Sequence, residues 1–183
     1  MNQLLRYFNF QPGETIVSLG CGGGVWEIGF GTTIDHLTFY LVEQNAEVLN
    51  SDEIQAGIQF WEKQLQKVTT SHFIPVINTE TNIPLPDQIA DKALILNALH
   101  EFSFPEPMLK EVRRILKFRG KVFIEEEIAT QVGVLHEGCG KPLFTETALQ
   151  TLVTTSGFYK QQEWPTTEIA RLFCYGNKIA SVA

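Results

Sequence analysis

Short apolar runs alternate with amphipathic segments along most of this chain. Five runs have the length of buried strands: 16–19, 37–42, 73–77, 92–97 and 121–124. Between them, apolar residues recur three to four positions apart, the spacing of one helix face, most clearly over 52–67 and 108–117. The alternation predicts an α/β fold in which helices cover a mainly parallel, doubly wound sheet.

The last part of the chain departs from this alternation. Strand-like runs at 158–164 and 169–175 are separated only by residues 165–168, and so short a connection predicts an antiparallel hairpin. Pro75 interrupts the third run. Because proline donates no ladder hydrogen bond, we expect that strand at or near a sheet edge. Without repeats or a linker-like segment, residues 1–183 are expected to form a single domain.

Caps and helix breakers predict where the helices begin and end. The helix that starts at Val25 should be short or irregular, because Gly29 and Gly31 weaken it. Asn45 is predicted to cap the next helix. Gly120 is predicted to end the helix that Pro105 opens, since it follows basic residues suited to a helix C-terminus.

A glycine-rich turn, residues 20–24, directly follows the first apolar run. Glycine has no Cβ, so the chain can turn sharply there and a ligand can approach the bare backbone. Glu43 ends the next run, roughly 20 residues further on, where nucleotide-binding folds place the carboxylate that binds ribose hydroxyls. The combination predicts a nucleotide-like ligand, with a glycine-rich turn that binds nothing as the alternative.

The glycine spacing distinguishes two kinds of cofactor. Gly20 and Gly22 fit the first two positions of the dinucleotide pattern G-x-G-x-x-G, but Val25 occupies the third, where close helix–strand packing needs glycine or alanine. The shorter pattern G-x-G-x-G is intact through Gly24. The spacing therefore disfavours a dinucleotide, and an NAD-binding reductase is kept only as a further alternative.

Charge and cysteine content exclude several classes of partner. The net charge of −7 comes without a basic patch, so we expect neither nucleic acid nor an anionic membrane as a partner. Three cysteines do not make a disulfide framework. The N-terminal residues lack a secretory pattern, and no apolar run has the length of a membrane span. We therefore expect a cytoplasmic protein with reduced thiols.

Several later segments occur in the order seen in one enzyme family. They are 83–87 (IPLPD), 97–102 (NALHEF), 109–120 (LKEVRRILKFRG) and 156–158 (SGF). With the glycine turn, they make the chain resemble the class I S-adenosylmethionine (SAM) dependent methyltransferases, in particular the small-molecule, type 11 members. The resemblance implies a Rossmann-like sheet of seven strands with the seventh antiparallel. It also implies SAM as cofactor and methyl transfer to a small-molecule acceptor.

The same resemblance implies which residues contact SAM. Those expected at its methionine part are Gly20, Cys21, Gly22, Gly24, Asn97 and Ala98. Those expected at its ribose and adenine are Glu43, Gln44, Thr79 and Glu80.

Some positions depart from the family pattern. Ser18 replaces the usual acidic residue of the first strand, Thr79 replaces a frequent aspartate, and Phe118-Arg119 replaces Pro-Gly. These departures keep open a second function, that of a degenerate SAM- or nucleotide-binding sensor or scaffold without methyl transfer.

His100 is the candidate catalytic residue. It follows the fourth run on the expected ligand side, where an imidazole can remove a proton from an acceptor hydroxyl, amine or thiol. A histidine that only caps or packs is the alternative. Methyl transfer can also need positioning alone, because the sulfonium is already a good electrophile.

Two other segments contain metal-ligand residue types. Glu125, Glu126 and Glu127 are adjacent, and because neighbouring strand residues face opposite sides of a sheet, they cannot all converge. His136-x-x-Cys139 has no matching second pair for zinc. We therefore expect no metal site, and a structural loop around Cys139.

Overall fold

Seven strands form one sheet in the computed structural model, which describes residues 1–177. The strands are β1 (Thr15–Leu19), β2 (Thr38–Glu43), β3 (His72–Ile77), β4 (Ala90–Leu96), β5 (Leu116–Glu127), β6 (Phe158–Pro165) and β7 (Ala170–Asn177). Their order is β3-β2-β1-β4-β5-β7-β6. The strand β7 runs antiparallel to both of its neighbours, β5 and β6. The predicted doubly wound sheet with a C-terminal hairpin is confirmed, and β3 lies at an edge as Pro75 indicated.

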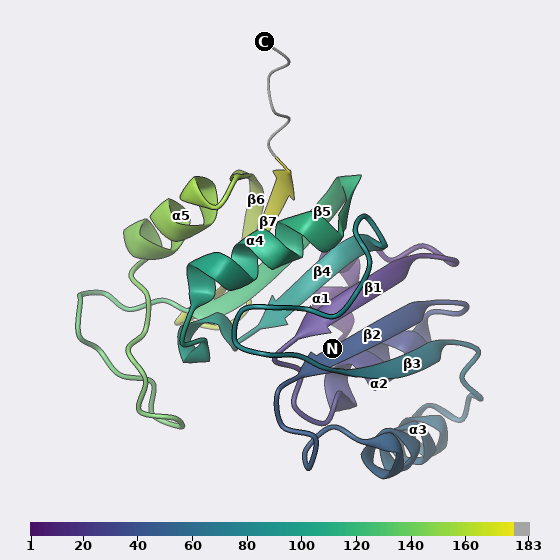
Figure 1. The fold of residues 1–183 in the computed structure, drawn as a ribbon. Helices are drawn as coiled ribbons and strands as arrows, with labels where there is room; N and C mark the ends of the chain where they lie inside the picture. Colours follow the sequence, from purple (N-terminus) through teal and green to yellow (C-terminus); the bar gives the residue numbers. More distant parts are fainter. Residues whose placement is uncertain (178–183) are drawn as a thin grey trace.

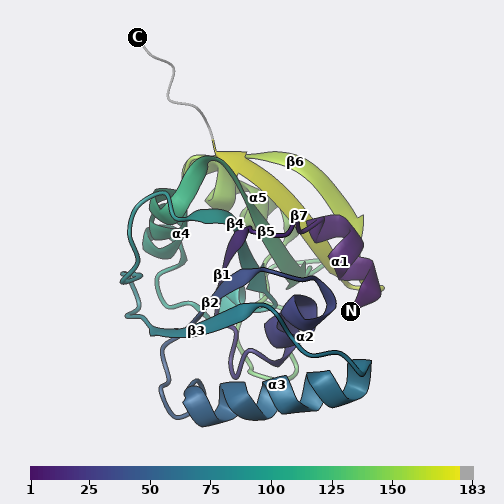
Figure 2. The same ribbon diagram turned by 90° about the vertical axis from the view of Figure 1, so that its right-hand side faces the viewer.

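Helices cover both faces of this sheet (Figures 1 and 2). They are α1 (Asn2–Phe8), α2 (Val25–Thr33), α3 (Ser51–Leu65), the short 3-10 helix η1 (Leu99–Glu101), α4 (Pro105–Ile115) and α5 (Glu146–Thr155). Successive strand residues point to opposite faces. Val17 and Val122 therefore belong to the core beneath α4 and α5, whereas Ile16 and Phe123 belong to the core beneath α1, α2 and α3.

An extended segment without a helix, residues 78–89, joins β3 to β4. Two α4 side chains from the LKEVRRILKFRG segment hold it. The Arg114 guanidinium donates to the carbonyl oxygens of Ile83 and Leu85, each at 2.8 Å. The Glu111 carboxylate accepts the Ile83 N–H at 3.0 Å. Glu111 and Arg114, which belong to this motif-like segment, therefore bind the backbone of residues 78–89 by hydrogen bonds.

Two predicted helix boundaries are wrong, and a third is confirmed. α2 begins at Val25 as expected. Asn45 lies in a turn instead of capping α3, and the Asn50 side chain caps that helix by accepting the N–H groups of Asp52 and Glu53. α4 ends at Ile115, and Gly120 lies within β5, because Leu116 already pairs with β4.

The sheet reverses its winding between β1 and β4. These strands are neighbours in space, but the chain leaves them toward opposite edges of the sheet. In open α/β sheets the crevice beyond the carboxyl ends of two such strands is where ligands bind. Among the described residues 1–177, no helix is long and apolar enough to cross a membrane.

Candidate functional site

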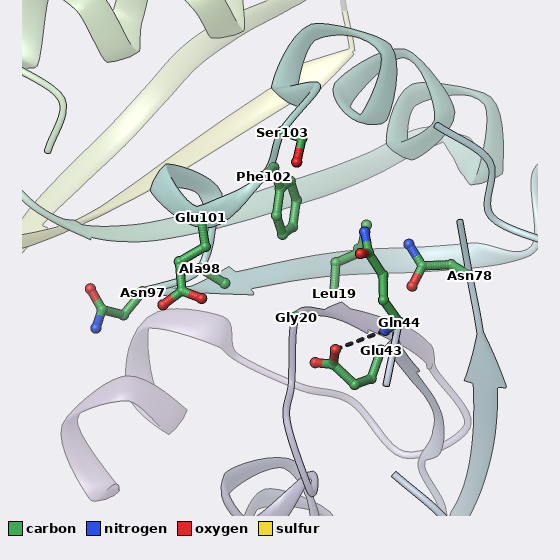
Figure 3. A pocket seen from close by; sticks show the side chains of 10 residues that line it. All are labelled: Leu19, Gly20, Glu43, Gln44, Asn78, Asn97, Ala98, Glu101, Phe102 and Ser103. Carbon is green, nitrogen blue, oxygen red and sulfur yellow. Dashed lines mark hydrogen bonds between the residues drawn. The ribbon is translucent and has the colours of Figure 1, made fainter. Parts of the chain in front are cut away.

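A cleft of about 180 Å³ lies beyond the carboxyl ends of β1 and β4 (Figure 3). Its lining residues are Leu19, Gly20, Glu43, Gln44, Asn78, Asn97, Ala98, Glu101, Phe102 and Ser103. In Figure 3, Glu43, Gln44 and Asn78 lie toward one end of the cleft, while Asn97 and Glu101 lie toward the other. Five of the ten residues expected to contact SAM line this cleft: Gly20, Glu43, Gln44, Asn97 and Ala98.

Gly20 and Gly22 serve the glycine turn differently, although both have a left-handed backbone. A Cβ on Gly20 would lie 2.7 Å from Cβ of Ala98 and 3.3 Å from a ring carbon of Phe102. A Cβ on Gly22 would meet no atom of residues 1–177 within 4 Å. Gly20 is thus required by the protein's own packing against the segment after β4. Gly22 instead presents open backbone that a ligand can approach.

Gly24 and Cys21 shape the turn and are not among the cleft-lining residues. Gly24 precedes α2 in a left-handed conformation, and a Cβ there would lie 2.7 Å from Cδ1 of Leu41. The Cys21 Sγ lies 3.6 Å from the Val42 carbonyl oxygen. Burial, together with the charges of Glu27 and Glu43, raises the pKa of Cys21, so this side chain stays a neutral thiol.

Backbone amides orient the Glu43 carboxylate at the end of β2. One oxygen accepts the Gly22 N–H at 3.1 Å, and the other accepts the N–H of Gln44 at 2.8 Å (Figure 3) and that of Asn45 at 3.3 Å. A carboxylate has about four acceptor sites. Acceptor capacity therefore remains for a ligand hydroxyl, and the group is already fixed before any ligand arrives.

Asn97 turns the chain from β4 into η1. Its φ of 51° lies in the left-handed region, which asparagine tolerates better than most residues. Its N–H donates to the Glu125 carbonyl oxygen at 2.8 Å. The turn brings Ala98 against Gly20 and Phe102 above it (Figure 3).

The structure puts Asn78, not Thr79 or Glu80, into the cleft lining. Thr79 and Glu80 form an exposed turn in which the Thr79 N–H donates to the Asn82 carbonyl oxygen. Asn78 directly follows β3, and its N–H donates to the carbonyl oxygen of Glu43. The sequence signal for Asn78 was its place directly after the third strand-like run, residues 73–77.

A buried carboxyl group lies beside β1, although Ser18 replaces the acidic residue that the family usually has in this strand. The Ser18 hydroxyl donates to Glu27, which comes from the first turn of α2, at 2.7 Å, and both side chains are buried. Burial raises the pKa of Glu27. Glu27 was not among the predicted site residues, although an acidic residue within an otherwise apolar helix start is a visible sequence signal.

His100 does not line the cleft, and its side chain is fully buried. Its Nδ1 lies 2.6 Å from Oε2 of Glu126, whose Oε1 accepts the Leu99 N–H at 2.6 Å. Burial by itself lowers the pKa of His100, but the bond and charge of Glu126, with Cys139, outweigh it and raise the pKa to about 9. An imidazolium accepts no proton, so a base role would require this pair to be deprotonated first.

A third segment reaches His100 from the loop after β5. The Cys139 Sγ lies 3.4 Å from Nε2 of His100 and 3.2 Å from Nδ1 of His136. In the sequence, His136 and Cys139 form a pair without a matching second pair. Only the folded chain brings them to His100, which is 39 positions from Cys139.

Comparison with known proteins identifies relatives of the whole fold. A family model, Methyltransf_11, described as "Methyltransferase domain", matches residues 17–124. A search of curated proteins found no match. A SAM-dependent methyltransferase from Aquifex aeolicus has a similar structure, with a TM-score of 0.73 at 16% identity, over 96% of this chain and 88% of that one.

Two further solved structures have a fold similar to that of this chain. A putative type 11 methyltransferase from Sulfolobus solfataricus gives a TM-score of 0.67 at 19% identity, over 100% of this chain and 94% of that one. The [4+2]-cyclase SpnF gives 0.70 at 13% identity, over 98% of this chain and 80% of that one. At such identities these structures show the shared fold alone.

Proposed function

Because this chain belongs to the type 11 methyltransferase domain family and is a SAM-dependent methyltransferase, we propose that the cleft of Figure 3 is where SAM meets a small-molecule acceptor. One observation carries the proposal. Gly20 of the glycine turn and the Glu43 carboxylate line a single cleft beyond the carboxyl ends of β1 and β4, together with five residues after β4: Asn97, Ala98, Glu101, Phe102 and Ser103. When bound there, SAM would supply a methyl group activated by its positively charged sulfur.

The end of the cleft near β2 suits the ribose and adenine. Glu43 is held by three backbone amides and keeps acceptor capacity, and a charged acceptor binds a hydroxyl more strongly than a neutral one. Gln44 and Asn78 add amide groups beside it. We assign these three residues to the nucleoside part of SAM, with Asn78 in place of Thr79 and Glu80.

The end near η1 suits the methionine part and the acceptor. Gly20, Asn97 and Ala98 line this part of the cleft, and Gly22 of the same turn leaves open space where a Cβ would be. Beyond them lie Glu101, Phe102 and Ser103. We assign this group to the acceptor, since Phe102 gives an apolar wall and Glu101 a carboxylate that can bind a polar group. His100 then supports this wall from the core instead of touching the acceptor.

Binding and turnover experiments test this function separately. Titration calorimetry should show binding of S-adenosylhomocysteine and no comparable binding of NAD; tighter binding of NAD would contradict the cofactor assignment. A screen of small-molecule acceptors, followed by release of S-adenosylhomocysteine, should then find a methylated product. The sensor or scaffold alternative expects the bound cofactor without any product, so one productive acceptor rejects it.

A further inference from the structure

Three potential metal ligands from two distant segments converge beside the cleft. They are His100 in η1, and His136 and Cys139 in the long loop 128–145 between β5 and α5, drawn in green in Figure 1. One ligand atom from each residue can be chosen so that all three lie within 4.8 Å of one another. We propose that these three residues bind a zinc ion.

The distances already approach those of a zinc site. Zn–N bonds of about 2.0–2.1 Å and a Zn–S bond of about 2.3 Å separate tetrahedral ligand atoms by about 3.3–3.6 Å. The Cys139 Sγ lies 3.4 Å from Nε2 of His100 and 3.2 Å from Nδ1 of His136. The remaining pair, one nitrogen from each imidazole, lies within 4.8 Å, so the two rings must move closer together to surround an ion.

Each imidazole has a carboxylate on the side away from the cluster. Nδ1 of His100 lies 2.6 Å from Oε2 of Glu126, which is completely buried. Nε2 of His136 lies 3.8 Å from Oε1 of Glu127. A metal-binding histidine commonly donates its second N–H to a carboxylate, which fixes the ring and strengthens the ligand. The adjacent glutamates thus face two different histidines, and Glu126 is within hydrogen-bonding distance of its histidine whereas Glu127 is at ion-pair distance.

The loop presents His136 and Cys139 on a tight turn. The His136 N–H donates to the Lys141 carbonyl oxygen, and the Gly140 N–H donates back to the His136 carbonyl oxygen. Gly140 has a positive φ of 68°. A Cβ on Gly138 would lie 3.1 Å from the His136 ring. The two glycines therefore allow the backbone to bring both ligand atoms to the same point.

The ligand types select the metal and disfavour a catalytic thiol. Two imidazole nitrogens and one thiolate suit zinc and related transition metals, whereas magnesium and calcium prefer oxygen. Cys139, His100 and Glu126 alone would also resemble a nucleophile, a base and an orienting carboxylate. That arrangement has no use for His136, whose Nδ1 faces the same sulfur.

Glu101 connects the three-residue cluster to the acceptor end of the cleft. Oε1 of Glu101 lies 3.8 Å from Nε2 of His100, and Glu101 also lines the cleft. A zinc ion in the cluster would link loop 128–145 to η1 and hold the acceptor wall. This positioning role rests on the proposed function, but zinc binding itself does not.

The test is zinc binding by the chelator-stripped full chain, measured by competition with a chromophoric chelator. One zinc per chain is expected for the wild type and for Cys174→Ser, a control thiol in β7 outside both the cluster and the cleft. Cys139→Ser and His136→Ala should bind zinc at least about 100-fold more weakly, and Glu126→Gln about 10–100-fold more weakly. Cobalt should give a thiolate charge-transfer band that Cys139→Ser lacks.

Two results would overturn the site. One is wild-type zinc affinity no higher than that of Cys139→Ser and His136→Ala. The other is alkylation of Cys139 by iodoacetamide at a rate that zinc does not slow, as expected for a thiol that binds no metal. Titration of the same samples with S-adenosylhomocysteine separates this proposal from the proposed function, because each binding event can fail while the other persists.

Discussion

The two ends of the cleft are built from different kinds of interaction. At the end near β2, backbone amides and left-handed glycines from neighbouring segments orient Glu43. At the end near η1, buried side chains far apart in the sequence orient one another, such as His100 and Glu126, which are 26 positions apart. The first end should therefore be sensitive to backbone strain and ligand contacts. The second should be sensitive to the loss of a buried charge partner.

The largest effect is expected for His100→Ala in the metal-free protein. The substitution leaves the fully buried Glu126 carboxylate without its ion-pair partner, which costs about 3–5 kcal/mol of unfolding free energy. Urea unfolding measures this loss. His136→Ala is the control, with a loss of about 1 kcal/mol or less, because this histidine lies on the partly exposed loop. A loss for His100→Ala no larger than the control's would contradict the buried ion pair.

Gly20→Ala should cause the next largest loss of unfolding free energy, about 2–4 kcal/mol. It adds a strained left-handed alanine to a contact of 2.7 Å with Ala98. Gly22→Ala has the same backbone strain but open space around the new methyl group, so about 1–2 kcal/mol is expected.

The same pair of variants separates packing from ligand binding. Gly22→Ala should keep the fold yet bind S-adenosylhomocysteine at least about tenfold more weakly. The new methyl group would fill the space through which the ligand approaches the Gly22 backbone. Wild-type affinity in Gly22→Ala would show that the ligand does not approach this residue. Equal destabilisation by both variants would show that the contact with Ala98 does not restrict Gly20.

Glu43→Ala should affect binding more than folding. Loss of the charged acceptor should weaken S-adenosylhomocysteine binding by about 1.5–3 kcal/mol, measured by calorimetry, with little change in the urea midpoint. Glu47→Ala is a matched control, since Glu47 is exposed nearby and does not line the cleft. If the Glu43 variant binds as tightly as the control, the ribose assignment is wrong.

The smallest loss of stability is expected for Glu111, whose carboxylate accepts the Ile83 N–H in the segment that follows Asn78. The hydrogen bond from Arg114 lowers the pKa of Glu111. A depressed carboxyl pKa stabilises the fold above the unfolded-state pKa, and this contribution is lost as pH falls through the folded-state pKa. Glu111→Gln should therefore lose about 0.5–1 kcal/mol near neutral pH.

Urea unfolding across acidic pH checks this sign. The stability difference between wild type and Glu111→Gln should shrink as pH falls below the ordinary carboxyl range, because the wild-type carboxyl group then becomes neutral as well. A difference that stays constant with pH would mean that the carboxylate charge contributes nothing to stability.

Local sequence signals predicted most elements but not every boundary. Strand runs, the start of α2 and the edge position of Pro75 depend on neighbouring residues and were predicted correctly. Asn45 and Asn50 are both suitable caps. In the folded chain Asn45 forms a turn, the Leu49 side chain is buried, and α3 begins after Asn50. The start of α3 therefore depends on how the folded chain packs, and a capping pattern in the sequence carries no information about packing.

The sequence by itself determined the sheet, the methyltransferase family and the glycine turn facing Glu43, because these follow from residue types at short and regular spacing. Only the tertiary structure decided the surroundings of His100. Parallel pairing of Leu96 with Glu125 brings the end of β4 beside Glu126, and loop 128–145 returns Cys139 to the same point. Strand register and the path of a long loop arise from packing across the whole sheet, so no local pattern specifies which distant side chains will meet.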